Sequence, residues 1–180
     1  MSNQILFWSI LVLPWLTLIF MKKETIKRFM PVALFSTLAS VLAVEVGENL
    51  GWFIYEAAAS PLRTGSYIIF GLNPVITIWL FHFIYGKFWT YLLIDTVLNF
   101  GFIYLFHVYF LGSRGLFQEI GITPSLNALI TTIVGVMAYG YQVWQEEIFA
   151  CPEKAGFKTN LQPATAKPLQ NEKENPHNDK

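Results

Sequence analysis

The sequence predicts an all-α integral membrane protein, a bundle of five transmembrane helices. Of its 180 residues, 54% are hydrophobic and only 13% are charged, whereas charged residues make up roughly 25% of an average soluble domain. The hydrophobic residues form long runs instead of amphipathic stripes, and a run of about 20 residues is long enough for a helix to cross a bilayer. The net charge is zero, so no basic surface indicates a nucleic-acid partner.

A short basic loop separates the first two predicted spans. The first covers about residues 5–21, which carry no charge and are followed by Lys22 and Lys23. A cleaved signal peptide has the reverse order, with positive charge before its apolar run, so we expect a retained span. Pro31 suits the first turn of a helix, and the second span is predicted over about residues 31–55.

Three further apolar runs and a polar tail complete the chain. The spans are predicted at about residues 67–85, 88–111 and 125–144, so that residues 1–147 form one membrane domain. Residues 148–180 are poor in large apolar side chains for most of their length. They cannot bury enough surface to fold, and we expect a disordered tail.

The basic residues predict the orientation of the bundle. One side receives the first loop, the turn at Gly86-Lys87 and the tail, which hold four, one and five Lys or Arg residues, and the other side receives only Arg63 and Arg114. Loops rich in Lys and Arg remain in the cytoplasm, so the N-terminus should be outside and the tail inside. The single cysteine, Cys151, is then cytoplasmic and reduced, and one cysteine allows no internal disulfide framework.

The second span ends in an unusual acidic stretch. Ionisable groups are costly in hydrocarbon and mark candidate functional sites. Glu45, Glu48 and Asn49 have the spacing of one helix face, together with Trp52 and Glu56. We expect this face to point into the bundle. At a rise of 1.5 Å per residue, Glu45 would lie about 21 Å from the cytoplasmic edge and be the most deeply buried of the three acids.

Polar residues of the third and fourth spans extend this hypothesis. Asn73 is predicted at a depth similar to that of Glu45, Asn99 near the midplane and His107 near the outer edge. We therefore expect an outward-facing polar pocket formed by Glu45, Glu48, Asn73, Asn99 and His107. The pattern assigns no catalytic residue to it. Because no Glu-x-x-His or His-x-x-x-His pair occurs on a predicted helix, we expect neither a metal nor another cofactor.

A second candidate lies toward the cytoplasmic side. His82 and Asp95 occupy two spans joined by a very short turn, so we expect antiparallel neighbours whose side chains pair. Such a pair is a reasonable unit for proton transfer. The alternative is structural, because polar contacts between membrane helices contribute about 0.6 kcal/mol on average and can simply fix the register of a hairpin.

Four short motifs stand out: Leu13-Pro14-Trp15-Leu16, the stretch from Lys22 to Val32, Gly86-Lys87-Phe88-Trp89, and the stretch from Tyr139 to Glu146. Together they resemble a family of small uncharacterised integral membrane proteins of Bacillus-like and Clostridium-like bacteria. The resemblance covers about residues 5–147 and implies a multi-pass protein of the bacterial plasma membrane. It implies no activity and assigns no catalytic residue.

Three functions remain open from the sequence. The first is a non-enzymatic structural or accessory protein whose polar groups pair internally, with a second copy or another membrane protein as its partner in the bilayer. The second is a small proton-coupled transporter or permeation subunit that uses Glu45 and the pair His82 and Asp95. The third is an enzyme that modifies a lipid or an isoprenoid, with Glu45 and Glu48 as acid and base. The first is the expected function.

Overall fold

The computed structural model describes residues 3–56 and 60–150, and in them it confirms an all-α bundle with five helices long and apolar enough to cross a membrane. The first four spans are α1 (Asn3–Thr17) with the 3-10 turn η1 (Leu18–Phe20), α2 (Lys23–Asn49), α3 (Thr64–Ile84), and α4 (Phe88–Gly101) with the π-helix η2 (Phe102–Leu111) and the 3-10 turn η3 (Gly112–Arg114). The fifth is α5 (Pro124–Ala150), which includes the first three residues assigned to the tail. Residues 151–180 lie outside the described part.

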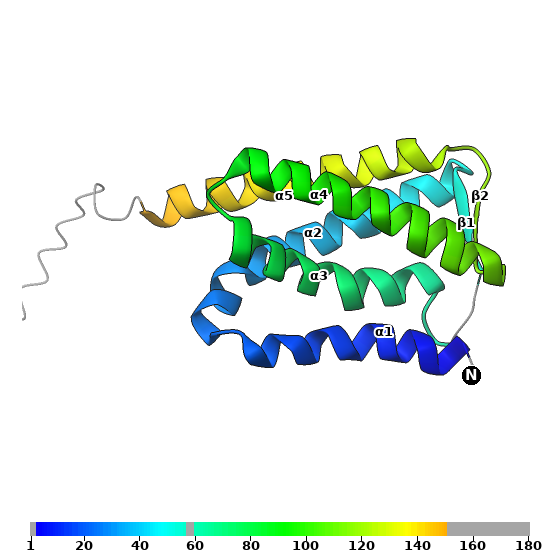
Figure 1. Cartoon of the computed structure of the whole chain (residues 1–180), viewed down its shortest axis with the longest axis horizontal. Coiled ribbons are helices and arrows are strands. Elements are labelled where there is room, and N and C mark those ends of the chain that lie inside the picture. The colour runs from blue at the N-terminus through cyan, green and yellow to red at the C-terminus, as the bar shows by residue number, and fades with distance from the viewer. Residues whose placement is uncertain (1–2, 57–59, 151–180) are drawn as a thin grey trace, which may run out of the picture.

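The helices run alternately up and down the bundle, and α1 lies at its edge (Figure 1). Helix α1 packs on α3, α3 packs on α2, α2 packs on α5, and α5 packs on α4. Helices α3 and α4 follow one another through a short turn but make few contacts with each other. The four helices α2 to α5 therefore surround a central space, and the α3–α4 side of this ring is its least closed side.

The second span differs from the prediction at both ends. Helix α2 begins at Lys23, so Pro31 lies inside it and not in its first turn. The helix continues because one proline removes a single backbone N–H, which membrane bundles tolerate. It ends at Asn49, before the predicted boundary at residue 55, because Gly51 adopts a left-handed conformation with φ of +69°. Glycine at this position is a common way to stop a helix.

A small antiparallel sheet closes the end of the bundle opposite the α1–α2 turn (Figure 1). Strand β1 (Phe53–Tyr55) pairs with β2 (Phe117–Glu119), with Phe53 opposite Glu119 and Tyr55 opposite Phe117. The sequence predicts the first segment as the end of the second span and the second as part of a loop. Strands of three residues are too short to show the alternation of apolar and polar residues that predicts a strand.

Two apolar clusters form the core, one toward each end of the bundle. The cluster near the α3–α4 turn contains Phe29, Val32, Ile78, Phe81 and Tyr91 among its buried members. The cluster beneath the sheet contains Phe7, Phe53, Tyr67, Leu111 and Phe117. Aromatic side chains are prominent in both clusters, so each end of the bundle is closed by aromatic packing.

Helices α1 and α3 approach closely where each contains a proline. A Cβ added at Gly71 of α3 would overlap the backbone carbonyl of Ile10 on α1. That carbonyl has no helical donor, because Pro14 stands four residues later and lacks an N–H. Pro74 frees the carbonyl of Phe70 in the same way, and the indole Nε1 of Trp15 donates to it at 3.0 Å. Both backbone carbonyls that lack a helical donor because of a proline therefore lie at this interface.

Candidate ligand-binding cavity

The fourth span presents one continuous column of side chains to the interior. Its members are spaced four residues apart, and all are buried or half-buried: Tyr91, Asp95, Asn99, Ile103, His107 and Leu111. In an α-helix such a column rotates by about 40° at each step and soon leaves the inner face. The π-helix η2 begins at Phe102, and its wider turns reverse this rotation. The change of helix type therefore keeps His107 on the same face as Asp95.

This column borders a cavity of about 460 Å³ inside the ring of helices. Small-molecule pockets usually have about 300–1,000 Å³ and a mainly apolar lining with a few polar groups, and the cavity fits this description. Its walls come from α2, α3, α4 with η2, α5 and β1, and they are mostly aliphatic and aromatic. Among the described residues, Asp95 is the only Asp, Glu, Lys or Arg in the lining.

The cavity reaches the outer surface of the protein between α3 and α4. Ile76 on α3 and Val97, Leu98 and Leu105 on the fourth span line it and are also exposed. These side chains are apolar, as expected for a surface in contact with lipid. The few contacts between α3 and α4 thus leave a sideways opening toward the bilayer.

Asp95 is held against the backbone of α5. The Asn99 amide Nδ2 donates to Asp95 Oδ2 at 2.9 Å, and a Cβ added at Gly135 would overlap the carboxylate. One turn earlier, the Tyr91 hydroxyl donates to the Gly135 carbonyl at 2.9 Å. Asp95 is only 8% exposed, and no ion-pair partner of it occurs among the described residues. A buried carboxyl group with one amide partner retains unused acceptor capacity.

The predicted pairing of His82 with Asp95 is wrong. His82 is exposed and lies next to the rings of Trp79 and Phe83, with centroid distances of 6.1 and 5.1 Å. Its helix packs on α1 and α2, whereas Asp95 belongs to a helix that packs on α5. A short connecting turn therefore did not make these two helices close neighbours along their length.

His107 lines the other end of the cavity and is 7% exposed. Its Nε2 lies 3.3 Å from the hydroxyl of Tyr55, and its Nδ1 is buried with no hydrogen-bond partner in the described structure. The Phe117 ring packs on the imidazole at a centroid distance of 4.9 Å. Tyr55 belongs to β1, and burial raises the pKa of its hydroxyl. The sheet thus covers this end of the cavity and places an imidazole beneath it.

Asn73 takes part in a polar contact between α2 and α3 on the cavity wall. Its Nδ2 donates to Ser40 Oγ at 2.8 Å, and its Oδ1 accepts from Ser36 Oγ at 3.3 Å. Thr77, one turn further along α3, donates to the backbone carbonyl of Asn73. Asn73 was predicted as a polar residue of the site, but its partners were not. The sequence feature that indicates these partners is the four-residue spacing of Ser36 with Ser40, and of Asn73 with Thr77, on two facing helices.

The acidic face of the second span does not point into the bundle, so the predicted polar pocket is wrong in this part. Glu45 and Asn49 are exposed, and the Asn49 amide donates to Glu45 Oε1 at 3.3 Å. Glu48 is half-buried and forms an ion pair with Arg63 at 2.8 Å. Because α2 ends at Asn49, Glu45 lies only about 6 Å from the helix end. Helix α2 tolerates these acids because they lie near its end, and not because they are buried inside the bundle.

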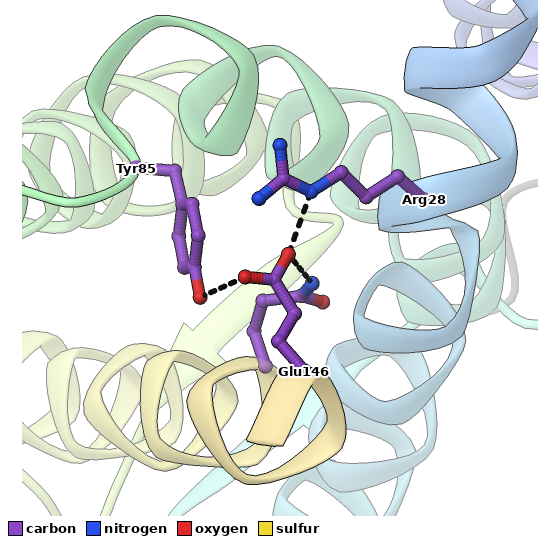
Figure 2. Close-up of polar contacts among 4 residues, drawn as sticks. Arg28, Tyr85 and Glu146 are labelled. Carbon is purple, nitrogen blue, oxygen red and sulfur yellow. Dashed lines mark hydrogen bonds and ion pairs between the residues drawn. The ribbon is translucent and has the colours of Figure 1, made fainter. Parts of the chain in front are cut away.

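A polar network at the opposite end of the bundle was not predicted (Figure 2). Glu146 on α5 accepts from Arg28 Nε at 2.6 Å, from the Tyr85 hydroxyl at 2.8 Å and from Gln142 Nε2 at 3.0 Å. The pKa of Tyr85 is raised to about 12 by burial and by its hydrogen bond to Glu146. The network joins α2, the α3–α4 turn and α5. Its members lie outside the cavity lining, so we assign it a structural role.

The comparisons with known proteins leave the cavity as the main guide to function. No protein-family model matches the chain, and no curated protein or solved structure matches it either. Within the described residues, no three His, Cys, Asp or Glu side chains are grouped closely enough to hold a metal ion.

Proposed function

We propose that the protein is a non-enzymatic, multi-pass protein of the bacterial plasma membrane that binds a lipophilic small molecule in its central cavity. The observation that carries this proposal is the cavity of about 460 Å³, with its largely apolar lining and a few polar side chains. Its sideways opening between α3 and α4 supports entry of the ligand from the bilayer and not from water.

The position of the acids favours binding over the two other functions. Glu45 is exposed and does not line the cavity, so it is not placed to transfer protons through the interior. The enzyme hypothesis used Glu45 and Glu48 as acid and base beside an apolar groove. Neither of these carboxylates belongs to the lining of the cavity.

A glycine on the cavity wall provides the test of binding. Gly101 lines the cavity, and a Cβ added there would meet no atom within 4 Å. A side chain can therefore leave Gly101 without a clash at its Cβ, and Gly101→Phe should obstruct the cavity at its sideways opening, where Val97, Leu98 and Leu105 lie on the same helix face. Gly140 on α5 is equally open but lies outside the lining, so Gly140→Phe is the matched control. Both variants replace a helical glycine by the same ring.

The assay is the thermal unfolding of the purified full-length protein in a neutral detergent, with and without 1-dodecanol. A ligand that binds only the folded state raises the Tm in a concentration-dependent manner. We expect the rise in the wild type and in Gly140→Phe and its loss in Gly101→Phe. Equal responses of all three proteins, or no response of the wild type, would refute cavity binding.

The proposed topology has the N-terminus outside and the C-terminal tail in the cytoplasm, from the distribution of basic residues. A reporter that is active only outside the cytoplasm, fused after Trp144, should be inactive. Activity of that fusion would contradict the proposed orientation.

A further inference from the structure

We propose that the ligand of the cavity carries a head group that donates hydrogen bonds and has no negative charge, namely an amine or a hydroxyl group on an apolar chain. This inference rests on the proposed function, since it specifies what the same cavity binds. It follows from the charge of the lining and from the hydrogen bonds that the lining has already formed.

The charge of the cavity excludes anionic head groups. Asp95 is the only formally charged side chain of the described lining, and no Lys or Arg of that part of the chain contributes to it. A phosphate or carboxylate would enter a low-dielectric space with no counter-charge and with a carboxyl group already present. An ammonium group would instead provide the ion-pair partner that Asp95 lacks.

The hydrogen bonds of the lining also leave acceptors in excess. Its donors are largely used inside the protein: the Tyr91 hydroxyl on Gly135, the Asn73 amide on Ser40, and the Thr77 hydroxyl on the backbone of α3. Asp95 receives one such donor, the amide of Asn99. A carboxylate has about four acceptor positions, so a head group that donates hydrogen bonds would find free acceptors at Asp95.

The place of the head group follows from this imbalance. We assign it to the space beside Asp95 and Asn99, next to the groove of α5 at Gly135. The apolar part of the ligand then extends toward His107, which lies twelve residues further along the fourth span. The unpartnered Nδ1 of His107 offers a second polar contact at that far end.

Three probes with the same chain and different head groups test the inference: dodecylamine, 1-dodecanol and dodecanoate. The measurement is the apparent dissociation constant from the concentration dependence of the Tm, with the full-length wild type and with Gly101→Phe. We expect dodecylamine and 1-dodecanol to bind and dodecanoate to bind at least about tenfold more weakly, because a charge-assisted hydrogen bond is lost. Gly101→Phe should abolish binding of all three.

Asp95→Asn provides the second arm. It keeps the size of the side chain and removes the negative charge. The variant should therefore bind dodecylamine about tenfold more weakly, and its affinity for 1-dodecanol should change much less. If this variant does not fold, the order of the affinities of the three probes for the wild-type protein decides the inference by itself. Dodecanoate that binds as well as dodecylamine, with both signals lost in Gly101→Phe, would overturn the head-group assignment and leave cavity binding intact. If no probe gives a signal that Gly101→Phe removes, the proposed function fails and this inference fails with it.

Discussion

The hydrogen bond between Trp15 and Phe70 is expected to contribute measurably to the stability of the bundle. Pro74 removes the N–H that would normally bind the Phe70 carbonyl, and the Trp15 indole supplies a donor at 3.0 Å in its place. In Trp15→Phe the carbonyl loses this donor at an interface between two membrane helices. An unsatisfied backbone group costs about 1–3 kcal/mol, so the free energy of unfolding should fall by that amount.

The test is reversible unfolding of the wild type and the variant in mixed detergent micelles. Trp89→Phe is the control, because Trp89 is 78% exposed and its loss should change stability by less than about 0.5 kcal/mol. Pro74→Ala restores an N–H at residue 74 and with it the helical partner of Phe70. In that background the cost of Trp15→Phe should fall to about 0.6 kcal/mol or less. Equal costs in both backgrounds would refute the argument that Trp15 replaces the donor removed by proline.

Three further outcomes are expected. Gly135→Ala should destabilise the protein by about 1–3 kcal/mol, because the new Cβ overlaps the Asp95 carboxylate; unfolding free energies measure it, and a neutral result would contradict the contact. Glu45→Gln should leave stability within about 0.5 kcal/mol and dodecylamine binding unchanged, since Glu45 is exposed outside the cavity; a loss of binding would contradict this. Burial raises the pKa of Glu119 above its usual 4.5, so its contribution to stability is fully present below that value and is lost as pH rises through the raised pKa. The Tm should therefore fall more steeply in the wild type than in Glu119→Gln as the pH rises above about 4.5, and parallel curves would show that Glu119 does not couple to folding.

The number of spans followed from the sequence because it depends on length and hydropathy alone. The ends of the spans depend on local backbone geometry, which those quantities do not contain. Pro31 looked like a helix start, but the polar residues Lys23 to Arg28 also continue the helix, because helical backbone bonds form equally well in the interfacial region. Gly51 falls inside the predicted second span, and its left-handed backbone instead ends α2.

The candidate site was predicted in part, and the error on the second span has a simple cause. The spacing of Glu45, Glu48 and Asn49 identifies residues on one helix face, but it does not say which face turns inward. On α2 the inward face carries Ser36 and Ser40, whose small hydroxyl groups fit against α3 and bind Asn73. A hydrophobicity pattern gives little guidance here, because lipid and protein interior are equally apolar.

The joint presence of Asp95 and His107 in one cavity depends on a feature that residue spacing does not reveal. In an unbroken α-helix His107 would lie about 120° around the axis from Asp95 and would leave the face that carries Asp95. The π-helix η2 removes this offset, and both side chains line the same space. π-helices are rare, occur mostly as single turns and are frequent at functional sites. A π-helix of ten residues therefore needs stabilising packing around it. The sheet that packs on His107 provides such packing at the closed end of the cavity, so the helix distortion, the sheet and the polar column form one structural unit.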